Sequence, residues 1–284
     1  MTTEAGTIDH RGCSLAYEAR GERGPAVLFI QGVGVHGGGW GPQVEALAGR
    51  YRCLTFDNRG MGRSQPLGGP LAVEQMADDA LALMDARGWE AAHVVGHSLG
   101  GLVAQHLAFA ARPRVRSLAL LCTFARGADA TRPTAWMVWV GMQTRIGTRR
   151  MRRRAFLRLV VPPAALNGID RDALAARLAP LFGHDLGVQP AVAMKQLRAM
   201  GRYDATPRLG ELAGLPTLVV AAESDRIAPP RVGRALAAGI PGARYVELAD
   251  ASHGVPLVEP ERINALLLDH FARVDDSLPT TRGG

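Results

Sequence analysis

The chain has no apolar run long enough to cross a membrane. A membrane-spanning helix needs about 18 or more consecutive apolar residues, and the longest apolar runs here are much shorter. The start, MTTEAGTIDHRG, is polar and lacks the apolar stretch of a secretory signal peptide. We therefore expect a cytoplasmic protein with no membrane span.

Cysteine is scarce as well. The 284 residues include three cysteines, Cys13, Cys53 and Cys122, and no two of them have C-x-x-C spacing. An odd, widely spaced set does not suit a disulfide framework or a zinc site, and it is typical of a chain that is kept reduced. The sequence therefore predicts no structural disulfide and no metal centre.

Acidic residues are few in one segment only. Residues 124–208 hold 15 Lys and Arg against 5 Asp and Glu, whereas the remainder holds 18 against 21. The densest part, residues 145–160, has no interleaved aromatic residues and matches no nucleic-acid-binding module. We interpret it as a solvated helix face and expect no nucleic-acid partner. An acidic partner, a lipid surface or an anionic substrate is the alternative.

Strand-like and helix-like segments alternate along most of the chain. The predicted strands are residues 13–21, 26–31, 52–57, 92–97, 115–123, 216–223 and 243–249, and the predicted helices are 72–88, 99–112, 231–239 and 259–274. This alternation predicts an α/β fold, with a mostly parallel sheet covered by helices on both faces. Residues 124–208 interrupt it with a helical, proline-punctuated pattern. We predict a core of residues 1–123 and 209–284, with 124–208 inserted between two strands as a helical cap.

The glycine-rich segment FIQGVGVHGGGW fits two kinds of site. Gly32, Gly34 and Gly37 spell the G-x-G-x-x-G of a dinucleotide-binding turn, and Asp57 follows twenty residues later. The same segment could be a loop whose backbone N–H groups face a developing oxyanion. A dinucleotide turn needs a helix over residues 34–45. The glycines and the proline in that range are unfavourable inside a helix. We therefore favour the oxyanion loop and expect no cofactor.

The stretch VVGHSLGG places Ser98 in a G-x-S-x-G pattern. A predicted strand ends at the pattern and a helix begins just after the serine, which is the sharp turn that exposes a nucleophilic hydroxyl. A serine needs a base, and the base needs an orienting acid. Asp225 and His253 each follow a later strand, at the sheet edge where parallel-sheet proteins build their sites. Glu223 and Asp250 are competing acids, and an incidental serine in a glycine-rich connection is the alternative.

Between about residues 13 and 274 the chain resembles an α/β-hydrolase with a helical cap. The motifs that carry the likeness are FIQG with Trp40, FDNRGMGRS, VVGHSLGG, ESDRIAPP and SHGVPLVEPE. The resemblance implies that Ser98 is the nucleophile, Asp225 the acid and His253 the base.

The resemblance also implies an oxyanion hole and a structural turn. The backbone N–H groups of Val33 and Leu99 would form the hole, and the turn FDNRGMGRS would give Asp57 and Arg59 structural roles. Many family members have His-Gly where this chain has Gln31 and a glycine. That departure leaves open what orders the loop.

These features predict a cofactor-free serine hydrolase that cleaves a carboxylic ester or lactone of a small apolar molecule through an acyl-enzyme. The C-terminal part is also similar to enol-lactonases, and to cofactor-free haloperoxidases. Hydrolysis of a carbon–carbon bond in a diketone would use the same residues. A non-hydrolytic or cyclising member of the fold is the remaining alternative.

Candidate pocket residues come from the oxyanion loop, the serine turn and the cap. We expect Gln31, His97, Trp136, Trp139 and Met142 to line an apolar pocket. Packing of the cap helices on one another explains the cap residues equally well. The sequence does not predict an oligomeric state.

Overall fold

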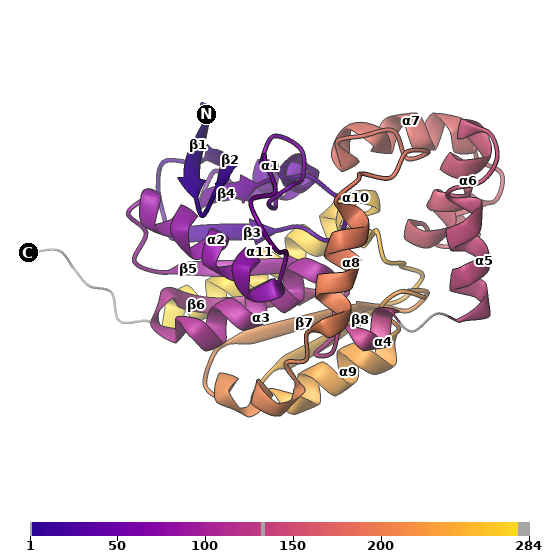
Figure 1. Ribbon diagram of the computed structural model, residues 1–284. Helices are drawn as coiled ribbons and strands as arrows, with labels where there is room; N and C mark the ends of the chain where they lie inside the picture. Colours follow the sequence, from indigo (N-terminus) through magenta and orange to yellow (C-terminus); the bar gives the residue numbers. More distant parts are fainter. Residues whose placement is uncertain (1, 132–133, 278–284) are drawn as a thin grey trace, which may run out of the picture.

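The computed structural model describes residues 2–131 and 134–277. Its strands are β1 Thr3–His10, β2 Cys13–Arg20, β3 Ala26–Ile30, β4 Arg52–Phe56, β5 Ala92–His97, β6 Val115–Leu121, β7 Thr217–Ala222 and β8 Arg244–Leu248. They form one sheet in the order β1-β2-β4-β3-β5-β6-β7-β8 (Figure 1). From β4 to β8 neighbouring strands in this order are parallel, whereas β2 is antiparallel to both β1 and β4. The predicted α/β class with a mostly parallel sheet is confirmed.

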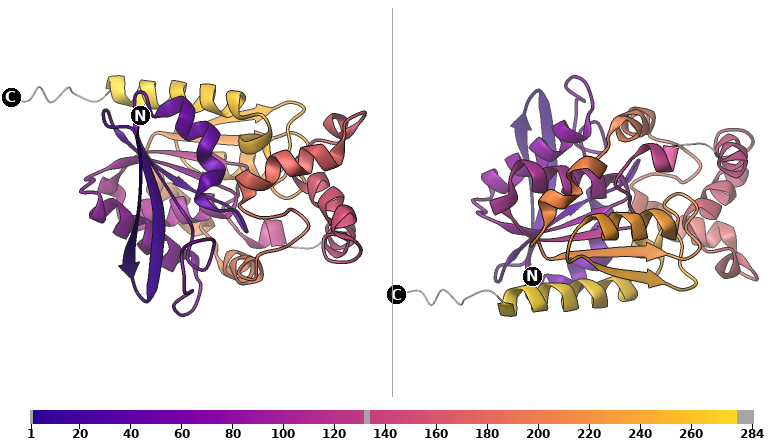
Figure 2. Two further views of the ribbon diagram at one scale, coloured as in Figure 1. Left: turned by 90° about the horizontal axis from the view of Figure 1, so that it is seen from above. Right: turned by 90° about the horizontal axis from the view of Figure 1, so that it is seen from below.

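Helices cover both faces of this sheet (Figure 2). One face carries α2 Val73–Ala86, α3 Leu99–Ala110 and α9 Pro230–Gly239, and the other carries α1 Gly41–Leu47 and α11 Pro260–Ser277. In β5, Val94 packs into the first layer and Val95 into the second. Because both faces are covered, β5 is buried at every position, which is why it forms a continuous apolar run in the sequence.

Strand β1 and helix α1 lie where the sequence predicted no element. Strand β1 pairs along its length with β2 at the edge of the sheet, and most of its side chains are exposed or half-buried. Its polar sequence therefore carries no burial signal. After a 3-10 turn over Gly37–Trp40, the helix α1 begins at Gly41, with Pro42 in its first turn. Proline is tolerated there because the first N–H groups of a helix have no intrahelical acceptor.

Residues 124–208, which we call the insert, lie in the connection between β6 and β7. Its helices are α4 Ala128–Thr131, α5 Ala135–Gln143, α6 Arg149–Val160, α7 Arg171–Phe182 and α8 Ala193–Arg202. Helices α5, α6 and α7 project beyond the end of the sheet (Figures 1 and 2). Helix α8 returns along the core, where Met200 is buried in the same apolar layer as α3. No helix among the described residues has the length and apolarity needed to cross a membrane.

The arginine-rich helix α6 is fastened to the rest of the insert by carboxylates. Arg150 and Arg154 both bind Asp172 of α7, at 2.7 and 2.8 Å. Arg153 binds Asp185 at 2.6 Å. These arginines are 39–68% exposed, as a solvated face requires. Their charges are nevertheless partly offset by Asp172 and Asp185, two carboxylates that have no local pattern in the sequence of α6.

A buried ion pair holds the turn after β4. Both Arg59 and Asp79 are almost fully buried, and the guanidinium donates to the two carboxylate oxygens at 2.7 and 2.5 Å. His10 from β1 contacts the same carboxylate at 2.8 Å. Because burial removes the solvation of both charges, each depends on the other for compensation. The pair therefore ties the turn to α2.

Replacing one partner of this pair should be costly. Asp79→Asn leaves the Arg59 guanidinium buried without a counter-charge, and we expect a loss of about 3–5 kcal/mol in the free energy of unfolding. The matched control is Glu18→Gln, which breaks the exposed pair between Glu18 and Arg63 and should cost less than about 1 kcal/mol. Urea unfolding of the three proteins measures both values, and equal losses would contradict the argument.

Candidate active site

Ser98 sits in a strained turn between β5 and α3. Its backbone has φ 53° and ψ −119°, a conformation that costs a non-glycine residue of order 1–3 kcal/mol and persists only where the surroundings enforce it. The Ser98 N–H donates to the carbonyl of Leu121 at 3.0 Å. The Ser98 carbonyl accepts from the Gly101 N–H at 2.9 Å and from the Thr123 hydroxyl at 2.7 Å. Both backbone polar groups are thereby fixed.

Two glycines make this turn sterically possible. A Cβ on Gly96 would collide with the carbonyl of Gly100, and a Cβ on Gly100 would collide with the carbonyl of Ile30. Neither backbone group can move away, because the strands and the helix hold them. The close passage of the chain around Ser98 therefore requires glycine at both positions.

The structure brings Ser98, Asp225 and His253 together from three separate strand ends. His253 Nε2 lies 3.1 Å from Ser98 Oγ, and His253 Nδ1 lies 2.7 Å from Asp225 Oδ2. The other oxygen, Asp225 Oδ1, accepts two backbone N–H bonds at 2.8 Å from Ile227 and Ala228. The three side chains are nearly buried. With its proton on Nδ1, His253 presents a lone pair to the serine hydroxyl.

The two competing acids lie elsewhere. Glu223 and Asp250 are both exposed, and the Glu223 carboxylate accepts the backbone N–H of Asp250 at 3.0 Å. The carboxylate that His253 contacts belongs to Asp225. Of the three candidate acids, Asp225 is the one that contacts the imidazole of His253. One of its oxygens faces the imidazole, and the other accepts N–H groups of its own loop.

His97, the residue before the serine, lies in the pocket wall and supports His253. Its Nε2–H donates to the His253 carbonyl at 2.9 Å, and the two rings are 4.9 Å apart. Burial, reinforced by the neighbouring His253, lowers the pKa of His97 to about 3. His97 is therefore neutral near pH 7, and it fixes the backbone that carries His253.

The loop after β3, which is expected to supply an oxyanion donor, runs directly over Ser98. A Cβ added to Gly32 would lie 3.1 Å from the Ser98 Cβ. The Val33 N–H has no hydrogen-bond partner within residues 2–131 and 134–277. Leu99 is the first residue of α3, and the leading N–H groups of a helix have no intrahelical acceptor. Both N–H groups expected to form the oxyanion hole are thus available as donors.

Gln31, which was expected to line the pocket, is not among the residues that line the cavity at Ser98 and instead helps to order this loop. Its side chain is 1% exposed, and its Oε1 accepts the Gly32 N–H at 3.2 Å. Its carbonyl accepts from the Asn58 side chain at 3.0 Å. Further along, the Asp57 carboxylate accepts the Gly37 N–H at 2.7 Å, so Asp57 has the expected structural role.

Side chains of the insert bind the backbone of Gly34, the residue after Val33. The sequence did not predict this contact. Gly34 has a left-handed φ of 72°. Its N–H donates to Oε1 of the fully buried Gln196 at 2.8 Å, and its carbonyl lies 2.9 Å from His184 Nε2. Both polar groups of Gly34 are therefore bound by insert side chains that lie about 150 or more residues away in the sequence. Such long-range contacts have no local sequence signal.

A cavity of about 180 Å³ opens onto Ser98 and His253. Its apolar wall comes mainly from the insert and from the loops after β7 and β8, through Phe156, Leu159, Val160, Phe182, Leu197, Met200, Ile227 and Leu257. Val33 and His97 also line it, as expected for a loop and a turn that frame the serine. The cavity suits a small apolar group beside the serine hydroxyl.

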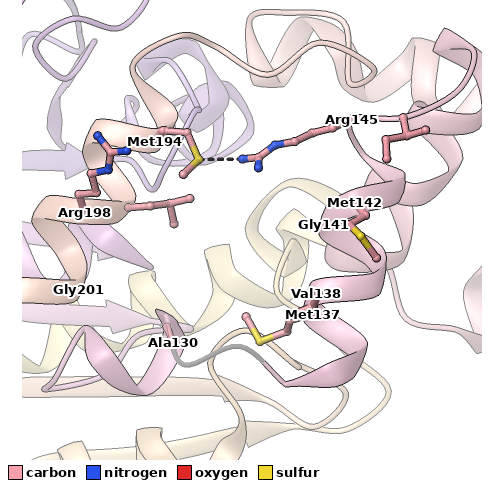
Figure 3. A pocket seen from close by; sticks show the side chains of 11 residues that line it. Ala130, Met137, Val138, Gly141, Met142, Arg145, Met194, Arg198 and Gly201 are labelled. Atoms are coloured by element: carbon pink, nitrogen blue, oxygen red, sulfur yellow. Dashed lines mark hydrogen bonds between the residues drawn. The ribbon is translucent and has the colours of Figure 1, made fainter.

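The three cap residues expected in this pocket lie outside it. Trp139 and Met142 are 47% and 49% exposed, and Met142 lines a separate groove between α5 and α8 (Figure 3). Trp136 lines a further cavity on the other side of α5. The pocket prediction is wrong for these residues, because the insert helices that line the cavity at Ser98 are α6, α7 and α8 rather than α5.

Comparison with known proteins places the chain among hydrolases. Residues 25–260 match the family model described as alpha/beta hydrolase fold. A relative from Azorhizobium caulinodans, named "Putative carbamate hydrolase RutD", is 34% identical over 92% of this chain and 96% of its own length. The enol-lactonase from Burkholderia xenovorans LB400 superposes with a TM-score of 0.79 at 28% identity, covering 94% of this chain and 100% of that one. An esterase from Thermogutta terrifontis has a TM-score of 0.77 at 27% identity, covering 95% and 99%.

The buried neutral state of His97 predicts a loss of stability in acid. Between about pH 6.5, the usual histidine pKa, and the folded-state pKa of about 3, the unfolded chain binds a proton that the folded chain does not. The free energy of unfolding therefore falls as the pH is lowered through this window. From pH 7.5 to pH 5, His97 should account for a loss of about 2 kcal/mol.

Urea unfolding at the two pH values tests this on the wild type and on His97→Gln, which keeps a donor but cannot titrate. The variant should lose about 2 kcal/mol less than the wild type on acidification. Gln105→Leu, a buried change without a titrating group, should retain the full wild-type loss. Parallel pH profiles for the wild type and His97→Gln would contradict the prediction.

Proposed function

The chain belongs to the alpha/beta hydrolase fold family, and we propose that it is a serine hydrolase cleaving a carboxylic ester or lactone of a small apolar substrate. The observation that carries this proposal is the hydrogen-bonded chain from Asp225 through His253 to Ser98, at 2.7 and 3.1 Å. It ends on a hydroxyl that opens into an apolar cavity. The insert serves as the cap over this cavity in the proposal.

The proposed reaction proceeds through an acyl-enzyme. His253 Nε2 takes the proton from Ser98 Oγ as the oxygen attacks the substrate carbonyl carbon. The Asp225 carboxylate holds the imidazole in place and stabilises the imidazolium that forms. The imidazolium then protonates the leaving oxygen as the acyl-enzyme forms. A water molecule, deprotonated by His253, releases the acyl group.

Charge develops on the carbonyl oxygen in both steps. The N–H groups of Val33 and Leu99 are the proposed donors to that oxyanion, and a preorganised donor of this kind contributes about 10²–10³-fold in rate. The Ser98 backbone is held from three sides and Gly34 by two insert side chains. The donors therefore need no rearrangement as the charge forms.

The substrate class follows from the size and lining of the cavity. A volume of about 180 Å³ with mostly apolar walls favours a short acyl chain or a small ring. Structural likeness to an enol-lactonase and an esterase supports a lactone or ester. The relative whose name refers to carbamate hydrolysis makes a carbamate the second candidate, since it presents a comparable carbonyl carbon to the serine.

Substitution of the proposed nucleophile and acid tests this function. Ser98→Ala should lower kcat/KM for nitrophenyl acetate by about 10³-fold or more with the fold intact, and it should abolish labelling by a fluorophosphonate probe. Asp225→Asn should also lower kcat strongly, because the imidazole loses its orienting acid. The matched control is Asp250→Asn, which should retain nearly full activity. Activity lost in Asp250→Asn but kept in Asp225→Asn would show that the acid is wrongly assigned.

A substrate panel identifies the class. Nitrophenyl esters of graded chain length, lactones, a carbamate and a diketone should be compared at equal concentration. We expect the highest kcat/KM among short esters or lactones, because a long chain exceeds the cavity volume. Turnover of the carbamate or the diketone alone would contradict the ester or lactone proposal.

Gln196 should influence the rate through the oxyanion loop. Gln196→Leu leaves the Gly34 N–H without its acceptor and loosens the loop that carries Val33, so we expect kcat to fall about 10-fold with KM changed less than twofold. Gln105→Leu, another buried glutamine change, should lower stability without this loss of kcat. An unchanged kcat in Gln196→Leu, in a protein still labelled by the fluorophosphonate, would overturn the role of Gln196 and leave the serine assignment intact.

A further inference from the structure

A second cavity, of about 220 Å³, lies where the insert meets the core. Arg158 at the end of α6 and Arg171 at the start of α7 line it from the insert, and Arg226 lines it from the loop after β7. Arg158 and Arg171 are half-buried and Arg226 is exposed at the rim. No aspartate or glutamate is among its described lining residues. Three arginines thus line one cavity that has no acidic residue among its described lining residues.

These arginines differ from their neighbours on α6. Arg150, Arg153 and Arg154 each bind a carboxylate. In contrast, Arg158 donates to the side-chain oxygen of Gln143, and Arg171 donates to a backbone carbonyl. A guanidinium has five N–H donors, so most donors of both groups remain uncommitted within the described part of the chain.

Aromatic rings hold two of the guanidinium groups in place. Arg226 lies over the ring of Trp136 at 4.6 Å, and Arg158 lies over Trp139 at 4.9 Å. Stacking of this kind uses the face of the guanidinium and leaves its N–H edge free. The side chains are therefore partly preorganised, which reduces the entropy lost when a ligand binds.

The arrangement carries an electrostatic cost in the absence of an anion. Burial, and then the charge of Arg171, lower the pKa of Arg158. Removing solvent from one guanidinium beside another is unfavourable unless a negative group lies between them. Ser224 and Asn167 also line the cavity and are neutral residues with hydrogen-bonding groups. A tetrahedral dianion can accept hydrogen bonds from several guanidinium groups at once, whereas a single carboxylate would neutralise only one positive charge.

We propose that this cavity binds a phosphate group, supplied either as inorganic phosphate or as a phosphate monoester. The site is distinct from the cavity at Ser98, since the two cavities share no lining residue, although the consecutive residues Val160 and Val161 place them close together. Its ligand would bridge α6 and α7 to the loop that carries Asp225. Phosphate binding would therefore fasten the insert to the core beside the serine site.

Calorimetric titration of the full chain tests this directly, with inorganic phosphate and phenyl phosphate as probes and sodium chloride at matched ionic strength as the salt control. The pocket variant is Arg158→Gln with Arg171→Gln. The matched control is Arg150→Gln with Arg154→Gln, which removes the same charge from the same region. We expect the control to keep the wild-type Kd within about twofold and the pocket variant to bind at least about 10-fold more weakly.

The Tm measured without phosphate shows whether the arginines form a binding site or instead stabilise the fold. The pocket variant should be as stable as the wild type or more stable, because it removes uncompensated repulsion. The control should be less stable, because it breaks both ion pairs to Asp172. Phosphate should raise the Tm of the wild type and the control but not that of the pocket variant.

The two probes distinguish the source of the phosphate group. A lower Kd for phenyl phosphate assigns the site to a monoester, and a lower Kd for inorganic phosphate assigns it to the free anion. No phosphate binding by the wild type, or equal weakening in both double variants, would overturn the proposal. None of these outcomes depends on ester hydrolysis, so the serine assignment is tested separately.

Discussion

The left-handed backbone of Ser98 is the constraint around which this structure is arranged. Its φ of 53° is unfavourable for a serine, and hydrogen bonds from β6, from α3 and from Thr123 hold it there. The same turn requires glycine at positions 96 and 100, because backbone carbonyls occupy the space of any Cβ. Strain at one residue is therefore maintained by the packing of the central strands, which are also the most buried part of the core.

The carboxyl edge of the parallel sheet supplies the remaining parts of the site. Asp225 and His253 follow the neighbouring strands β7 and β8, and the loop that carries Val33 follows β3 on the other side of β5. The insert completes this edge in two ways. It contributes apolar walls such as Phe156 and Leu159, and it binds both backbone polar groups of Gly34. A segment that interrupts the sheet in sequence thus becomes part of the site in space.

Charge is distributed unevenly over the insert. Around Asp172 and Asp185 the arginines of α6 are paired and exposed, and each such pair contributes modestly to stability. At the junction with the core, Arg158, Arg171 and Arg226 line a cavity that has no acidic residue among its described lining residues, and Arg158 and Arg226 lie over indole rings. The basic residues of 124–208 therefore form two groups, one paired with carboxylates and one without them. In the sequence the two groups appear as a single basic segment.

The sequence determined the central strands and the order of the candidate residues, whereas the tertiary structure decided how the insert meets them. Strands buried on both faces form continuous apolar runs, so β3, β5 and β7 were predicted within a few residues, and Ser98, Asp225 and His253 could be placed at strand ends. The edge strand β1 was missed because its side chains face solvent and carry no apolar pattern. Trp139 and Met142 were wrongly assigned to the pocket because composition cannot tell which helix of an insert faces the sheet. That choice depends on packing between residues distant in sequence, as does the contact between Gln196 and Gly34, and no local pattern encodes it.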